Sequence, residues 1–238
     1  MFLKELSEAS GVSSREQEIR DLIRDYVKPN VDELFTDSLG NLYAVKGKTK
    51  PGPKVMLAAH MDEVGLMITN IEKSGLLRFS PVGGIDPRVL VSKPVYIGKD
   101  KVIGVIGAKA IHLQRPEERT QVLGFDDLYI DIGASDDDEA KKLVKIGDVA
   151  IFTTKYQQMG DLVLGKAFDD RAGCAALVEL TKVEFDCPVY FVFTVQEEVG
   201  LRGAGPASYR VEPDVALVLE GTTASDVGAT DGANYSTW

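Results

Sequence analysis

The chain has 238 residues, 44% of them hydrophobic and 27% charged, which suits one large globular domain or two small ones. Its net charge of −10 disfavours nucleic acid and anionic membranes as partners, because both are bound through basic surfaces. The two cysteines lack C-x-x-C spacing, which predicts a protein without a disulfide framework. The charged amino terminus does not resemble a signal peptide, and no apolar run could span a bilayer, so we predict a cytoplasmic protein.

The first 60 residues predict a helix followed by strands. Apolar residues recur at helical spacing, and Ser13 with Glu16 matches a capping box. A continuous apolar run that ends at His60 is typical of a strand buried on both faces. The predicted elements are a helix over 1–27, a hairpin with strands over 31–37 and 42–45 and a turn at 38–41, and a strand over 55–59.

Short β-prone runs fill the chain between residues 64 and 155, and Gly and Pro separate them. This pattern predicts a small β-rich unit resembling a barrel. One helix is predicted near Ser135, because Asp136, Asp137 and Asp138 suit the positive end of a helix dipole and lack the spacing of a calcium loop.

Longer apolar elements return after residue 161. They predict a helix over 170–182, a strand over 189–195, a helix over 200–209 and a strand over 215–219. Because strands alternate with helices, we predict an α/β fold. One domain consists of residues 1–63 and 156–238, and the β-rich domain of residues 64–155 interrupts it.

Acidic and imidazole side chains lie late on several apolar runs. Burying such groups unpaired is costly, and the carboxyl ends of strands in an α/β sheet gather at one edge, where ligands bind. The sequence therefore predicts a site for one or two divalent cations. The residues are His60 and Asp62 in A-A-H-M-D-E-V-G, Asp169 and Asp170 in K-A-F-D-D-R-A-G, Glu197 and Glu198 in V-Q-E-E-V-G, and Glu220 in L-V-L-E-G.

Each of these motifs also has a simpler structural interpretation. The H-x-D motif supplies a metal ligand with the carboxylate that orients it, or a hydrogen-bonded structural histidine. In the Asp pair we expect one carboxylate on metal, while the other caps a helix or pairs with Arg171. The Glu pair is a ligand beside a general base, or a solvated charge pair.

Three other features predict little chemistry. The G-x-x-G-x-G order at residues 200–205 does not match a nucleotide-binding loop. His112 is interpreted as a loop or interface histidine. Cys174 is interpreted as a small core residue, because no histidine neighbours it in the sequence.

Taken in order, A-A-H-M-D-E-V-G-L-M, G-K-A-F-D-D-R-A-G and V-Q-E-E-V-G-L-R-G-A resemble the tetrahedral, or deblocking, aminopeptidases of the M42 family. Many members of that family are also labelled CelM-type endoglucanases. The resemblance covers nearly the whole chain. It implies a zinc-peptidase-like α/β sandwich, interrupted by a small β-barrel-like dimerisation domain. It also implies homo-oligomers built from dimers, commonly dodecamers.

The resemblance further implies a di-metal aminopeptidase that removes amino-terminal residues from short peptides. His60, Asp169 and Glu220 would hold one metal, zinc or cobalt. Asp169 would bridge to a second metal, also held by Glu198. In that scheme Asp62 orients His60, a metal-bridging water is the nucleophile, and Glu197 is the general base.

One part of the family pattern is absent. Its second metal takes a further histidine from a carboxyl-terminal segment, whereas the only other histidine here is His112, in the β-rich domain. We therefore expect a chain that lacks this segment, with a second site that is incomplete. Three alternatives remain: an inactive or assembly-only homologue, a related di-metal amidohydrolase, and an endoglucanase, whose chemistry needs two carboxylates and usually no metal.

Overall fold

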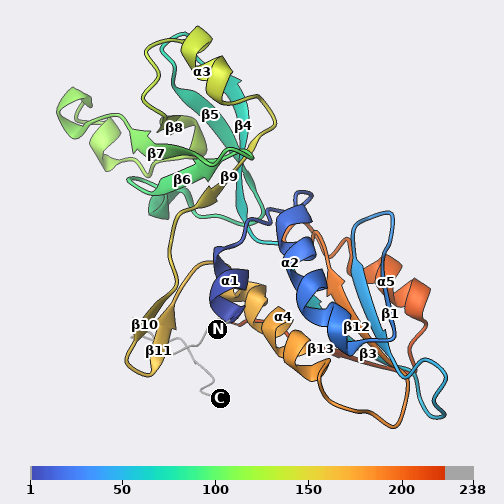
Figure 1. The fold of residues 1–238 in the computed structure, drawn as a ribbon. Coiled ribbons are helices and arrows are strands. Elements are labelled where there is room, and N and C mark those ends of the chain that lie inside the picture. Colours follow the sequence, from blue (N-terminus) through green and yellow to red (C-terminus); the bar gives the residue numbers. More distant parts are fainter. Residues whose placement is uncertain (1, 223–238) are drawn as a thin grey trace.

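A computed structural model describes residues 2–222 (Figure 1). It contains a five-stranded sheet packed between helices, a closed six-stranded barrel and a separate two-stranded hairpin. The barrel stands apart from the sheet domain and is joined to it through β4 and the segment after β9 (Figure 1). Within residues 2–222, no helix is long and apolar enough to cross a membrane.

The central sheet has the strand order β1-β2-β12-β3-β13. Its last three strands run parallel to one another, while β2 is antiparallel to both of its neighbours. The parallel strands therefore end at the same edge of the sheet. The strands are β1 (Glu33–Thr36), β2 (Leu42–Lys46), β3 (Val55–His60), β12 (Val189–Thr194) and β13 (Val215–Val218).

Helices cover both faces of this sheet, as expected for an α/β sandwich. Successive side chains of a strand point to opposite faces. Phe191 and Phe193 of β12 accordingly pack with the helices of one face, and Val192 packs with Ala207 and Val211 on the other. The first face carries α1 (Phe2–Glu8), α2 (Gln17–Val27) and α4 (Phe168–Leu180), and the second carries α5 (Ala204–Val211).

The β-rich unit is a closed barrel with the order β4-β5-β8-β7-β6-β9 and its own hydrophobic core. All its strands lie within the predicted interval 64–155. Helix α3 (Asp137–Leu143) begins where predicted, and Asp136 caps it by accepting a hydrogen bond from the Glu139 amide at 2.8 Å. The strands are β4 (Gly65–Ile71), β5 (Leu77–Val82), β6 (Pro94–Ile97), β7 (Val102–Ala108), β8 (Leu128–Asp131) and β9 (Val149–Phe152).

The predicted helix over 1–27 is wrong, because the structure has two helices with a loop between them. Ser13 and Glu16 form no capping box: the Ser13 hydroxyl donates to Asp62 at 2.6 Å, and Glu16 makes no cap hydrogen bond. The loop instead packs against the segment after β3, where Val12 pairs with Glu63 in a parallel bridge. Tertiary contacts therefore replace the local cap.

Smaller differences concern element ends. Helix α5 begins at Ala204, four residues later than predicted, and Asp169 and Asp170 have non-helical backbone angles inside α4. The hairpin of β10 (Gln157–Met159) and β11 (Leu162–Leu164) was not predicted. The five short 3-10 helices are η1 (Lys28–Asn30), η2 (Pro87–Val89), η3 (Ile111–Leu113), η4 (Glu118–Thr120) and η5 (Phe125–Asp127).

Candidate metal centre

The strand order brings the predicted site residues to one edge of the sheet. His60 is the last residue of β3 and lies opposite Thr194, the last residue of β12, in the parallel register. Glu197 and Glu198 follow β12 by a few residues, and Glu220 follows β13 in the same way. Asp169, at the start of α4, lies at this edge too. Side chains from four separate segments therefore converge around one imidazole.

The His60 ring is the centre of this cluster. Its Nε2 atom lies 2.9 Å from Asp169 Oδ1, 3.4 Å from Glu220 Oε1 and 3.8 Å from Glu197 Oε2. Its Nδ1 atom lies 3.4 Å from Asp62 Oδ1 and makes no hydrogen bond within the described residues. The ring thus presents one nitrogen to several carboxylates and the other to a single buried one.

Two groups of ligand atoms surround this imidazole, each with its atoms within 4.8 Å of one another. One group is His60, Asp169 and Glu220, and the other is His60, Glu197 and Glu198. Glu198 is grouped with Glu197, so the sharing of Asp169 between two metals stays a prediction. Imidazole and carboxylate ligands in this mixture suit zinc, cobalt or manganese.

Among residues 2–222, the His60 imidazole is the only positively charged group that pairs with the carboxylates of this cluster. None of Asp169, Glu197, Glu198 and Glu220 forms an ion pair with a lysine or arginine there. Like charges this close repel one another, and a divalent cation would offset that repulsion. The donor set and its missing positive charge therefore fit a metal centre.

Electrostatics at the cluster favour bound protons when no metal is present. Burial disfavours the charged imidazole, but Asp62, Asp169 and Glu220 outweigh it and raise the pKa of His60 to about 10. Burial, together with neighbouring carboxylates, raises the pKa of Glu198 to about 7. Burial also raises the pKa of Glu220. A metal that binds here must displace these protons, so its affinity is expected to rise with pH.

Asp62 ties the histidine to the two glutamates. It is fully buried and accepts hydrogen bonds from the backbone amides of Glu197, at 3.0 Å, and Glu198, at 3.2 Å, besides the Ser13 hydroxyl. Burial alone would raise the pKa of Asp62, but the neighbouring His60 imidazole and hydrogen bonds from Ser13 and Glu197 lower it below its usual value. The residue is thus held as a carboxylate beside His60.

Asp170 takes the capping role that was one of two expectations for the Asp pair. One carboxylate oxygen accepts from the Gly173 amide at 3.0 Å, and the other accepts from the His60 amide at 3.1 Å. It makes no ion pair with Arg171. A side chain at Gly173 would place its Cβ 2.4 Å from Asp170, so the glycine is needed for this contact. Asp170 therefore joins the end of β3 to the start of α4.

Sequence reasoning missed a buried ionic cluster beside the site. Glu63 receives Lys166 Nζ at 2.7 and 2.8 Å and Arg171 Nη2 at 3.5 Å, and all three side chains are at least 94% buried. Lys166 also donates to the carbonyl of Ala9. Glu63 directly follows Asp62, but its partners are more than 100 residues away, so no local pattern indicates the cluster.

The remaining candidates lie where they were expected. His112 is exposed on η3, next to the barrel and away from the cluster. Cys174 is fully buried and its thiol donates to the His60 carbonyl at 3.1 Å, so it is confirmed as a core residue. Residues 223–238, the end of the predicted domain segment 156–238, lie outside the described residues.

Comparison with known proteins agrees with this arrangement. Lysyl aminopeptidase of Pyrococcus furiosus is 36% identical over 232 residues, which cover 94% of this chain and 66% of that protein. A Thermotoga maritima structure titled as an endoglucanase is 43% identical with a TM-score of 0.82, covering 95% of this chain and 67% of that one. The TET1 peptidase of Pyrococcus horikoshii, titled as assembling into a tetrahedron or a large octahedral shell, is 36% identical with a TM-score of 0.84, covering 95% and 71%.

The chain spans about two thirds of the length of the curated relatives it matches. The profile of the M42 glutamyl aminopeptidase family matches residues 40–237, which include every residue of the acid cluster. From this match, and from relatives that are more than 30% identical over nearly the whole chain, the protein belongs to the M42 peptidase family.

Proposed function

We propose that this protein is a metal-dependent aminopeptidase that hydrolyses the first peptide bond of short peptides. The observation that carries the proposal is the His60 imidazole between two groups of carboxylates that have no lysine or arginine partner among the described residues. A site for divalent cations at the carboxyl ends of parallel strands, in a member of a peptidase family, supports hydrolysis of peptides.

In this proposal His60, Asp169 and Glu220 would hold one cation, and Glu198 and Asp169 would contribute to a second. Zinc and cobalt are the cations that we expect. When bound, they supply Lewis acidity, which polarises a carbonyl and makes water easier to deprotonate. Asp62 orients the imidazole, since a carboxylate beside the second ring nitrogen of a histidine fixes its tautomer and direction.

Glu197 is the general base in this scheme. Its backbone amide is held by Asp62, while its side chain reaches to 3.8 Å from His60 Nε2 and is 30% exposed. The carboxylate therefore lies at the cluster and stays accessible to water. It accepts a proton from the attacking water and passes it to the nitrogen of the departing amine. In this proposal the two glutamates therefore have different tasks.

An excess of carboxylates suits a substrate with a free amino terminus. A free amino terminus can be held by the carboxylate charge that would remain once the cations are bound, whereas an internal peptide bond brings no positive charge to the site. This difference favours removal of terminal residues over internal cleavage. Peptides with a free amino terminus are therefore the proposed substrates.

We also propose that the barrel is an assembly surface for homo-oligomers. Several large apolar side chains are exposed on the barrel and its connections, which is typical of protein–protein contacts. They are Ile103, Val105, Ile111, Leu113 and Val122. The assembly of the TET1 peptidase of Pyrococcus horikoshii into a tetrahedron or a large octahedral shell supports this proposal.

The test combines a chelator with one substitution. Peptide hydrolysis by the chain loaded with zinc or cobalt should be lost with EDTA, and Glu197→Gln should keep the metal but lower turnover by at least about a hundredfold. Glu179→Gln, an exposed glutamate of α4 paired with Lys182, is the matched control and should change nothing. Unchanged turnover in Glu197→Gln would refute the assignment of the base.

The same experiment separates the alternatives. Cellulose hydrolysis that survives EDTA would support the endoglucanase interpretation, since that chemistry usually needs no metal. Fewer than two metals per chain, without hydrolysis of any peptide, would support an assembly-only homologue. A substrate panel with amino-acylated and amino-terminally blocked compounds distinguishes an aminopeptidase from a related amidohydrolase.

A further inference from the structure

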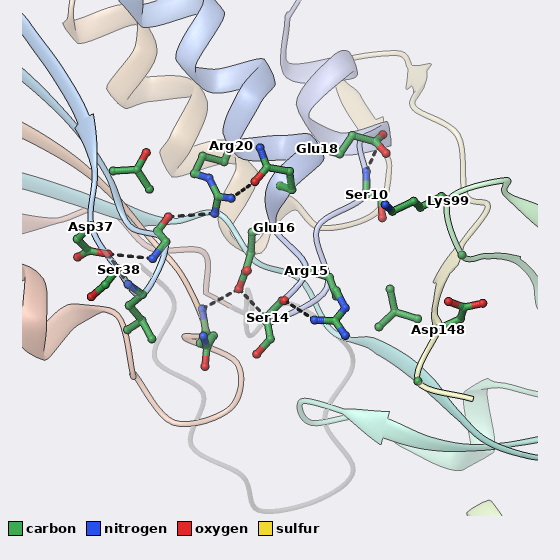
Figure 2. Close-up of a pocket in the computed structure, with 18 residues that line it drawn as sticks. Ser10, Ser14, Arg15, Glu16, Glu18, Arg20, Asp37, Ser38, Lys99 and Asp148 are labelled. Carbon is green, nitrogen blue, oxygen red and sulfur yellow. Dashed lines mark hydrogen bonds between the residues drawn. The ribbon is translucent and has the colours of Figure 1, made fainter. Parts of the chain in front are cut away.

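A cavity of about 880 Å³ lies between the sheet domain and the barrel (Figure 2). Four regions line it: the start of α2 with the preceding loop, the turn between β1 and β2, Gln196 after β12, and two barrel loops. The barrel contributes Gly98 and Lys99 from one loop and residues 147–149 from another. The volume lies within the range of pockets that bind small ligands.

One lining residue of this cavity is the chain neighbour of the proposed catalytic glutamate. Gln196 lines the cavity and directly precedes Glu197, so their Cα atoms are about 3.8 Å apart. The Gln196 amide donates to Glu16, a second lining residue, at 3.3 Å. The turn at residues 37–40 connects the two antiparallel strands at the edge where β12 ends, because Leu42 pairs with Phe193. The cavity and the acid cluster therefore share one edge of the sheet.

The lining carries polar groups without partners. Gln196 is 91% buried, yet its side-chain amide makes no hydrogen bond within residues 2–222. Arg15 and Lys99 form no ion pair there, and Arg15 donates only to the carbonyl of Ser14. In the view of Figure 2, Lys99 lies on the side opposite Asp37, and Arg15 lies between them beside Ser14. Both are exposed cations on an acidic protein, and both are free to pair with an anionic group of a ligand.

The carboxylates of the lining are already occupied by donors. Glu18 accepts from Lys101 at 3.0 Å, and Asp148 accepts from the Lys145 amide at 2.8 Å. Asp37 accepts three backbone amides of its own turn, and Glu16 accepts the Ser14 amide. The lining groups without a side-chain partner within residues 2–222 thus include the Gln196 carboxamide and the two exposed cations. A short peptide complements these groups, with its amino terminus at the acid cluster and its carboxylate at the cations.

We propose that the cavity binds the carboxyl-terminal side of a short peptide substrate. Gln196 would bond the peptide backbone, while Arg15 and Lys99 receive the terminal carboxylate. This inference rests on the proposed aminopeptidase function and adds a preference for short peptides with a free carboxyl terminus. A charge-assisted hydrogen bond to a carboxylate is about twice as strong as a neutral one, so amidation of that terminus should be costly.

The experiment compares one tetrapeptide with its carboxyl-terminal amide. The amino-terminal residue is the one whose p-nitroanilide the chain hydrolyses fastest. We expect KM for the acid to be about tenfold below KM for the amide. In the double variant Arg15→Gln, Lys99→Gln the two values should become equal. Lys142→Gln, which removes an exposed cation of α3 outside the cavity lining, should keep the tenfold ratio.

Two results would overturn the inference. One is equal KM for acid and amide in the wild-type chain, and the other is an unchanged ratio in the double variant. If no p-nitroanilide is hydrolysed at all, the proposed function fails. Binding of the fluorescently labelled tetrapeptides to the chain then tests whether the cavity holds a peptide carboxylate. Tighter binding of the acid that the double variant loses supports the site, and equal binding of acid and amide refutes it.

Discussion

Replacing Glu63 by glutamine should cost more stability than any exposed charge in the chain. The carboxylate receives both Lys166 and Arg171, besides the Gly11 amide at 3.1 Å, and both cations are buried. Glutamine keeps the shape but leaves two buried cations without a counter-charge, which costs about 3–5 kcal/mol. For a chain of this size, about 2–4 °C of melting temperature is lost per kcal/mol, so we expect a decrease of about 6–20 °C.

Thermal and urea unfolding of the metal-free chain measure this effect. Glu184→Gln is the matched control, since Glu184 pairs with Lys46 at 2.8 Å but is 78% exposed, and it should change stability by less than about 1 kcal/mol. The double variant Glu63→Gln, Lys166→Met removes one of the stranded cations and should recover part of the loss. If the free energy of unfolding of Glu63→Gln lies within about 1 kcal/mol of the wild-type value, the buried cations need no carboxylate and the reasoning is refuted.

Two further predictions concern the acid cluster. Asp62→Asn should weaken zinc binding about 10–100-fold, because it removes the carboxylate that supports His60. Ser13→Ala removes only one hydrogen bond to Asp62 and should weaken zinc binding less. Calorimetric titration measures both affinities. Glu198, with a pKa raised to about 7, and His60, with a pKa raised to about 10, hold protons in the folded chain that the unfolded chain loses at lower pH. Their stabilisation is complete at low pH and is lost as pH rises through these values, so the metal-free melting temperature should fall between pH 5 and 8, and a rise there would contradict the assignment.

The convergence of the acids at one edge could be predicted from the sequence. The apolar runs before His60 and Glu197 have the length and composition of strands buried on both faces, and such strands are parallel neighbours in α/β sheets. Residues that follow them must then meet at one edge. The pattern is informative because it depends on long, continuous elements rather than on single residues.

The contacts that support the cluster could not be predicted in this way. Ser13 and Glu16 match a capping box as well as any true one, but the Ser13 hydroxyl is used 49 residues away, at Asp62. Lys166 is 103 residues from Glu63. Local patterns carry no information about such pairings, because the same residue types serve caps, ion pairs and solvated surfaces. The cavity between the domains was missed for the same reason.

The four residues after Ala59 show how one short segment serves opposite surroundings. His60 and Asp62 face the acid cluster, while Met61 is fully buried in the hydrophobic core and Glu63 meets the buried cations. Shifting an extended segment by one residue exchanges these surroundings. Such a slip would place a carboxylate in the core and leave Lys166 unpaired. The buried ions therefore matter less as net stability, which desolvation largely offsets, than as a constraint that holds the imidazole and its carboxylate at the site.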